Sequence, residues 1–239
     1  MAKDLSLIFP CYNEAPVFRD SVARARQALS SSGIDFEIIF VDDCSSDGTQ
    51  GLIRQELKSS KCCSAIFHAS NVGRGGSVAD GIRAARGRVA GYLDIDLEIS
   101  PVYIAEMLRA IDSGCEVACA HRHYDFTLRS AFRNLLHSAY SSFAVTLLRL
   151  PVSDPNAGCK FFLRKGILPV LGATEDRHWF WDTEVVKRAQ IAGLKMREVP
   201  VLYLQNAKKR SSVKVLRDTA HFIRKVLSFR ELLAKEGAL

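Results

Sequence analysis

The sequence predicts an α/β fold, with a mainly parallel sheet flanked by helices. Short apolar runs alternate with helix-like segments from the start of the chain, and this alternation is typical of parallel strands joined by helical crossovers. The length of 239 residues and the apolar content of 48% are sufficient for one large domain or two small ones.

In the first half, we expect strands at residues 5–9, 36–41, 65–67, 89–93 and 116–120. Residues 89–93 (Val-Ala-Gly-Tyr-Leu) are continuously apolar, as expected of a strand buried on both faces. Helices are expected at about 16–31, 75–85 and 101–113, with another starting at 47–49. Pro101 opens one of them, since proline is tolerated in the first turn.

The second half is less regular. Strands are expected at 161–163 and 196–203, and a helix at 183–192. Two amphipathic helices are predicted by apolar residues at helical spacing. One stripe runs from Leu128 to Leu147, and the other comprises Val213, Leu216, Ala220, Ile223 and Leu227.

Charge is concentrated at the carboxyl end. Beyond residue 206 the sequence has nine Lys or Arg residues and only three acidic residues, so this segment carries +6 of the net charge of +7. An anionic partner is expected. Nucleic acid is disfavoured because few aromatic residues are interleaved with the charges. No apolar run reaches the roughly 18–20 residues that span a bilayer, and the amino terminus has no signal-peptide pattern, so we expect a cytoplasmic protein. The seven cysteines lack zinc-type spacing and are expected to be buried thiols.

Asp94-Ile95-Asp96 directly follows the apolar run at 89–93. Carboxylates at the end of a core strand need a partner or a metal, because burying an unpaired charge is costly. Two carboxylates together with substrate phosphates are a common way of binding Mg²⁺. The alternative is that both side chains face water or cap the next helix.

Three further polar loops follow the other expected strands, at residues 10–14, 42–49 and 71–76. Ligands bind at the carboxyl ends of the strands in open parallel sheets. The glycines at 73, 75 and 76 follow the third strand rather than the first, which excludes the dinucleotide-binding fingerprint.

These motifs, in this order, resemble those of the inverting family 2 glycosyltransferases with the GT-A fold, and among them the polyprenyl-phosphate glycosyltransferases of the dolichol-phosphate mannose synthase type. The resemblance runs from residue 5 to about 218. It rests on Pro-x-Tyr-Asn-Glu at 10–14, Val-Asp-Asp-x-Ser-x-Asp-Gly-Thr at 41–49, the glycine-rich stretch at 71–81, Asp-x-Asp at 94–96, Ser-Asp-Pro-Asn-Ala-Gly-Cys-Lys at 153–160, Trp-Asp-Thr-Glu at 181–184 and Glu-Val-Pro at 198–200.

The resemblance implies a donor site for a nucleotide-diphosphate sugar of the GDP-mannose or UDP-glucose type. Asp94 and Asp96 would hold Mg²⁺ or Mn²⁺, and Glu98 stands where the family usually has Gln. The other residues implied on the donor side are Pro10, Tyr12 and Glu14 around the base and ribose, Asp43 as acceptor of a base N–H, and Ile95 between the metal ligands.

The acceptor implied is a polyprenyl phosphate. A phosphate monoester has a second pKa of about 6, so it is largely a dianion at neutral pH and needs no general base. It needs cations, and the family positions match Arg122, Lys208, Arg210 and Lys214, although Lys208 and Ser211 depart from the usual residues. The sequence leaves two roles open for Asp182. It would be the general base if the acceptor were a glycan hydroxyl, and otherwise would orient the donor or pair with an arginine.

We therefore expect a GT-A catalytic domain at residues 1–206, with a nucleotide-sugar-binding half at 1–120 and an acceptor half at 121–206, followed by a basic amphipathic helix at 207–239. The two amphipathic helices are expected to lie at an anionic membrane surface, which makes the protein peripheral at the cytoplasmic face. The alternative is that both pack on the sheet. A membrane-protein partner or a homo-oligomer is a further expectation, and a nucleotide-sugar-binding module without activity is the non-enzymatic alternative.

Overall fold

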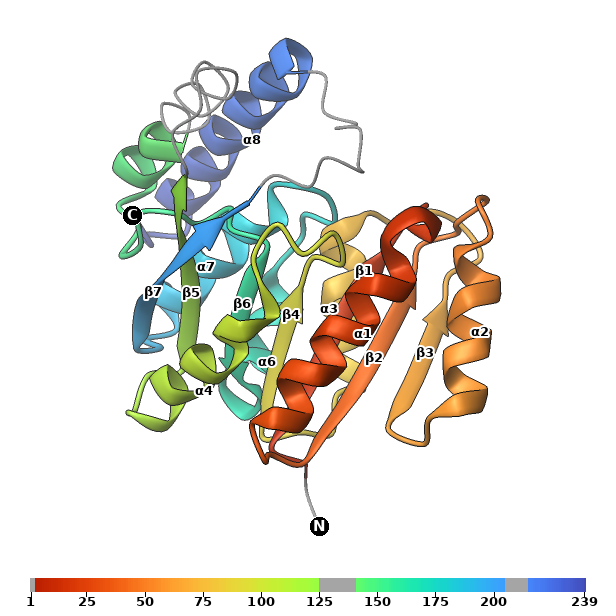
Figure 1. The fold of residues 1–239 in the computed structure, drawn as a ribbon. Helices are drawn as coiled ribbons and strands as arrows, with labels where there is room; N and C mark the ends of the chain where they lie inside the picture. The colour runs from red at the N-terminus through yellow and green to blue at the C-terminus, as the bar shows by residue number, and fades with distance from the viewer. Residues whose placement is uncertain (1–2, 125–140, 205–214) are drawn as a thin grey trace.

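The computed structural model describes residues 3–124, 141–204 and 215–239 (Figure 1). Within these ranges the strands are β1 (Leu5–Cys11), β2 (Phe36–Asp42), β3 (Cys63–Phe67), β4 (Val89–Leu93), β5 (Val117–Tyr124), β6 (Cys159–Leu163) and β7 (Met196–Tyr203). The helices are α1 (Ala15–Ser31), α2 (Thr49–Ser59), α3 (Arg74–Ala84), the short η1 (Pro101–Tyr103), α4 (Ile104–Asp112), α6 (Arg164–Ala173), α7 (Trp181–Ile191) and α8 (Val215–Lys235).

The described strands form one sheet in the order β3-β2-β1-β4-β6-β5-β7. The pairs β1–β2, β2–β3, β1–β4 and β5–β7 are parallel, whereas β6 is antiparallel to both neighbours. The expectation of a mainly parallel α/β sheet is confirmed. Because β6 runs in reverse, its first residue pairs with the last residue of β4 (Cys159 with Leu93), and the segment that enters β6 lies at the carboxyl ends of the parallel strands.

Helices cover both faces of the sheet (Figure 1). One buried cluster joins the sheet to α1 and α4, through side chains such as Phe18 and Met107. The other joins it to α3, α6, α7 and α8, through Val78, Ile167, Val185 and Val226. Helix α6, which contains Pro169, was not predicted.

Helix α8 packs against the rest of the protein through residues outside the apolar stripe noted in the sequence. Val226, Phe229 and Leu233 are the buried residues, and the Phe229 ring lies 5.6 Å from the ring of Phe180, between centroids. In the predicted stripe, Ala220 and Leu227 are exposed. The helix thus packs through other residues than this stripe, and the expectation that the stripe lies at a membrane surface stays a prediction. The first amphipathic helix expected, at 128–148, falls largely outside the described residues. Residues 141–148 are helical.

Among the residues that the structure covers, no helix is both long and apolar enough to cross a bilayer. The cysteines are free thiols, and Cys11, Cys115, Cys119 and Cys159 are buried as expected. Cys44 is exposed, contrary to expectation.

Candidate active site

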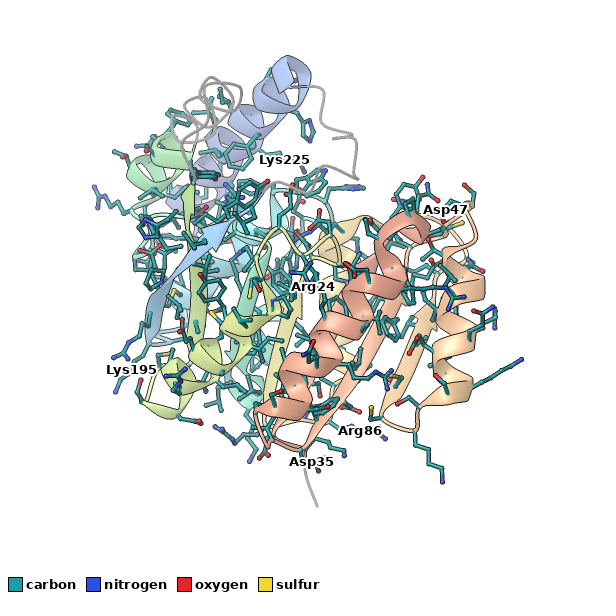
Figure 2. The ribbon with its side chains drawn as sticks, in the orientation of Figure 1. Arg24, Asp35, Asp47, Arg86, Lys195 and Lys225 are labelled. Carbon is teal, nitrogen blue, oxygen red and sulfur yellow. The ribbon has the colours of Figure 1, made fainter. Side chains whose placement is uncertain are left out.

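The candidate site lies at the carboxyl end of the sheet, between β1 and β4. The chain turns outward in opposite directions from these adjacent strands, because β1 is followed by β2 on one side and β4 by the strands on the other. Such a switch point leaves a crevice where ligands bind in open α/β sheets. Asp47, from the loop after β2, lies at this end of the molecule, while Asp35 and Arg86 lie at the opposite end (Figure 2).

Asp94 and Asp96 lie in a tight turn at the end of β4. The Asp94 N–H donates to the carbonyl of Gly158 at 2.9 Å, and Leu97 closes the turn with a φ of +53°. Gly158 allows the close approach, because a Cβ there would lie 2.0 Å from Oδ2 of Asp94. The side chain of Asp94 is 33% exposed.

Arg74, the first residue of α3, bridges two of the predicted site residues. Its Nε and one terminal nitrogen lie 2.8 and 2.7 Å from Oδ1 of Asp94, and the other terminal nitrogen lies 2.6 Å from Oδ2 of Asp182. The absence of a side chain at Gly75 lets α3 approach the start of α7, since a Cβ there would lie 2.3 Å from Cβ of Trp181. The glycine-rich loop thus leads into Arg74, which contacts the aspartates.

Asp182 is buried beneath this arginine. Its Oδ1 accepts hydrogen bonds from the Lys160 ammonium at 2.8 Å and from the Tyr92 hydroxyl. Burial alone would raise the pKa of Asp182, but Arg74 and Lys160 hold it below its ordinary value. Asp182 therefore pairs with an arginine, one of the two alternatives left open for a phosphate acceptor.

The pKa of Asp94 is raised, whereas that of Asp182 is lowered. Burial raises the pKa of Asp94, Arg74 opposes the increase, and the neighbouring carboxylates of Asp96 and Asp182 add to it. Asp94 and Asp182 share the guanidinium of Arg74, and Asp182 also contacts Lys160. A further cation at the Asp94–Asp96 end would offset the repulsion between these two neighbouring carboxylates.

The carboxylate oxygens of Asp94 and Asp96 are also suitable ligands for Mg²⁺ or Mn²⁺. Asp94 and Asp96 offer carboxylate oxygens from one turn, and no group of three or more His, Cys, Asp or Glu able to hold a metal occurs in the described part of the chain. Two carboxylates completed by substrate phosphates are typical of Mg²⁺ sites, whereas a site made only of protein ligands would need more.

Arg122 lies on β5 and holds the loop that enters β6. Its Nε and one terminal nitrogen each lie 2.7 Å from a different carboxylate oxygen of Asp154. Glu198 on β7 accepts from the backbone N–H groups of Ser153 and Asp154 at 2.8 and 3.0 Å. Arg122, which the resemblance assigns to phosphate binding, thus contacts the turn that contains Gly158 and leads to Lys160 on β6.

The residues expected on the donor side lie at the same rim. Pro10 is buried at the end of β1, Tyr12 is 52% exposed and Glu14 is buried at the start of α1. Asp43 is buried as well, and its two carboxylate oxygens accept from the backbone N–H groups of Val72 and Gly73 at 2.8 and 2.9 Å. Asp43 therefore ties the loop after β2 to the glycine-rich loop, in addition to any contact with a base.

Two donor-side residues flank the aspartates. Ile95 is buried in the core, and Glu98 accepts a hydrogen bond from the hydroxyl of Tyr203 on β7. Lys208, Arg210 and Lys214 lie outside the described residues.

Sequence reasoning gave no role to four residues that the structure brings to the site: Arg74, Tyr92, Asn156 and Lys160. Tyr92 and Lys160 pair across β4 and β6, which no local pattern reveals. Asn156 accepts from the Thr183 hydroxyl at 2.9 Å, and its buried amide nitrogen has no hydrogen-bond partner among the described residues. The polar residues at 153–160 were a usable signal, since the turn belongs to the motif that carried the resemblance.

Comparison with curated proteins identifies relatives that transfer sugars, as their names state. Glycosyltransferase AglD of Haloferax volcanii is 31% identical over 204 residues, a match that covers 83% of this chain and 32% of the relative. Dolichyl-phosphate beta-glucosyltransferase of Dictyostelium discoideum is 28% identical over 213 residues, covering 82% of this chain and 65% of the relative. The chain thus spans about one third to two thirds of the length of these relatives.

Solved structures with the same fold include a mannosyltransferase from Pyrobaculum calidifontis in complex with GDP-Man and Mn²⁺, with a TM-score of 0.63 and 19% identity over 88% of this chain and 59% of that one. Glucosyl-3-phosphoglycerate synthase from Mycobacterium tuberculosis, in a complex with Mn²⁺ and UDP, gives a TM-score of 0.71 and 15% identity over 95% of this chain and 80% of that one. At these identities the likeness establishes the GT-A fold alone.

A family model described as Glycosyl transferase family 2 matches residues 6–171. This range contains the loops after β1 to β4, the Asp94–Asp96 turn, and Lys160. The chain belongs to glycosyl transferase family 2.

Proposed function

We propose that this protein is an inverting, metal-dependent glycosyltransferase that moves a hexose from a nucleotide-diphosphate sugar to a polyprenyl phosphate. The observation that carries the proposal is the Asp94–Asp96 turn at the switch point between β1 and β4, held against Arg74 and Asp182. The name of the Dictyostelium discoideum relative, dolichyl-phosphate beta-glucosyltransferase, supports the acceptor class. GDP-mannose and UDP-glucose are the donor types to test.

Each part of the site has a task in this reaction. Asp94 and Asp96 hold Mg²⁺ or Mn²⁺, which acts as a Lewis acid toward the leaving nucleotide diphosphate when bound. Pro10, Tyr12, Glu14 and Asp43 surround the nucleoside. The acceptor's phosphate oxygen attacks the anomeric carbon from the opposite side, so the configuration inverts. The cations proposed to hold the acceptor phosphate are Arg122, Lys208, Arg210 and Lys214.

The state of Asp182 favours a phosphate acceptor over a glycan hydroxyl. A general base works best when its pKa lies near the working pH. The contacts of Asp182 with Arg74 and Lys160 at 2.6 and 2.8 Å lower its pKa instead. A carboxylate held in this way is a weak base. A phosphate dianion needs none, because it is already ionised.

The dependence of the rate on pH distinguishes the two acceptors. We expect kcat/KM for a polyprenyl phosphate to rise with pH through about 6, as the second ionisation of the acceptor phosphate produces the dianion. The measurement is a pH–rate profile with a polyprenyl phosphate and with the matching phosphonate, whose higher second pKa should move the acid limb upward. The limb should persist in the residual activity of Asp182→Asn. If the acid limb of the profile is the same with both acceptors and disappears in Asp182→Asn, Asp182 is the general base.

We also propose that α8 binds peripherally at the anionic, cytoplasmic face of the membrane, where a lipid-linked acceptor is held. A side of α8 next to its buried stripe carries Ala220, Ile223 and Leu227; Ala220 and Leu227 are exposed, Leu227 by 44%, and Ile223 is partly buried. The sequence from residue 207 to the end has a net charge of +6. Each basic residue near an anionic surface contributes about 1 kcal/mol to binding, and inserting apolar side chains adds to this.

Sedimentation with anionic liposomes at low salt tests this surface. The protein should sediment with the liposomes, and Leu227→Glu should lower the bound fraction. Ile191→Glu is the matched control, because Ile191 on α7 is similarly exposed, at 46%, and lies outside the proposed surface. Wild-type protein that stays entirely in the supernatant would exclude peripheral binding.

A further inference from the structure

Arg74 already occupies the carboxylate that the proposed metal needs. Two of its nitrogens contact Oδ1 of Asp94 at 2.8 and 2.7 Å, and its side chain is only 12% exposed. The guanidinium also lies over the rings of Tyr92 and Trp179, at 5.2 and 5.5 Å from their centroids. It is therefore held between aromatic rings and two aspartates rather than extended into solvent.

Lys160, the other cation of this cluster, does not neutralise Asp94. Lys160 contacts Asp182, Tyr92 and the carbonyl of Ala157. Of these partners, Asp182 is the carboxylate with which it forms an ion pair. On the other side, Oδ2 of Asp94 lies against Gly158. In the described residues, Arg74 is thus the cation that neutralises Asp94.

We infer that Arg74 competes with the divalent cation for Asp94, so that the free enzyme binds metal weakly and the donor diphosphate strengthens metal binding. The inference rests on the proposed metal and donor site. A divalent cation at Asp94 and Asp96 shares Oδ1 of Asp94 with the guanidinium and is repelled by its charge. A diphosphate gives Arg74 a second anion, which weakens its hold on Asp94. Metal and nucleotide then bind cooperatively, with a coupling that is reciprocal.

The test is a titration of the nucleotide-free protein with Mn²⁺, in which electron paramagnetic resonance measures the unbound ion. Arg74→Met should bind Mn²⁺ about tenfold more tightly than wild type, within the range usual for coupled sites. Arg74→Lys should bind more tightly than wild type by a smaller factor, because one ammonium cannot reach both aspartates as the guanidinium fork does. It serves as the second variant if Arg74→Met does not fold.

Arg83→Met is the matched control. Arg83 lies on the same helix and pairs with Asp80 at 2.8 Å, with a side chain that is 45% exposed, so Mn²⁺ binding should equal that of wild type. Adding Asp96→Asn to Arg74→Met should abolish the gain, which places the extra affinity at the aspartate pair. Unchanged or weaker Mn²⁺ binding in folded Arg74→Met and Arg74→Lys would overturn the inference.

Repeating the titration with UDP and with GDP separates the inference from the proposed function. Wild type should gain Mn²⁺ affinity on adding the matching nucleotide, and Arg74→Met should gain less. If neither nucleotide binds, but Arg74→Met still tightens Mn²⁺ binding, the donor site fails and the competition at Asp94 stands. If a nucleotide binds with Mn²⁺ and replacing Arg74 changes nothing, the competition fails and the donor site stands.

Discussion

Asp96→Asn should lower kcat/KM for hexose transfer by at least about a thousandfold while leaving the fold intact. A metal that stabilises the charge of a leaving group contributes several kcal/mol to the transition state, and each 1.4 kcal/mol or so corresponds to a tenfold change in rate. Asparagine keeps the size of the side chain and removes its charge. Asp96 lies in a partly exposed turn after β4, so the substitution should have little effect on packing.

The measurement compares kcat/KM and the melting temperature of Asp96→Asn with those of wild type. Asp20→Asn is the control, because Asp20 is exposed on α1 and makes a long contact of 3.9 Å with Arg24. Its activity should match wild type. Asp96→Asn enzyme that keeps wild-type turnover would remove Asp96 from the metal site.

Lys160→Met should lower the free energy of unfolding by about 3 kcal/mol, because removing one partner of a buried ion pair leaves the other charge uncompensated. Lys160 is fully buried, and its ammonium lies 2.8 Å from Oδ1 of Asp182. Arg74 still contacts Asp182, which keeps the loss at the lower end of the usual range. For a chain of this size the melting temperature should fall by about 6–12 °C.

Urea unfolding followed by circular dichroism measures this loss. Lys3→Met is the control, since the Lys3–Asp35 pair is largely exposed, with side chains 33% and 53% accessible, and such pairs contribute about 0–1 kcal/mol. A double-mutant cycle with Asp182→Asn should give a coupling energy of at least about 1 kcal/mol. A loss for Lys160→Met no larger than that for Lys3→Met would mean that the buried pair does not stabilise the fold.

Local patterns predicted the parallel half of the sheet because each strand there is a short apolar run bounded by a polar loop. Val89–Leu93 is observed as predicted, and the loops after β1, β2 and β4 meet at one rim. Helix α6 was missed because Pro169 interrupts its pattern. In α8, the contact of Phe229 with Phe180 identifies a side that packs, which the spacing of apolar residues along the helix did not specify.

The residues of the candidate site were predictable where they belong to one short sequence motif, as Asp94 and Asp96 do. They were not predictable where distant residues meet. Arg74 and Asp182 lie 108 positions apart, and Lys160 reaches the site only because β6 runs antiparallel to β4. Arg122 was singled out by its place after a strand, but its pairing with Asp154 depends on how the following loop folds back.

A direct assay of sugar transfer tests the central claim. The protein is incubated with Mn²⁺, a short polyprenyl phosphate and radiolabelled UDP-glucose or GDP-mannose, and the lipid extract is counted. We expect one donor to yield a labelled glycosyl phosphate lipid of inverted configuration, and chelating the metal to stop its formation. The absence of a labelled lipid with either donor, or a lipid product formed equally well in the chelator, would contradict the proposed reaction.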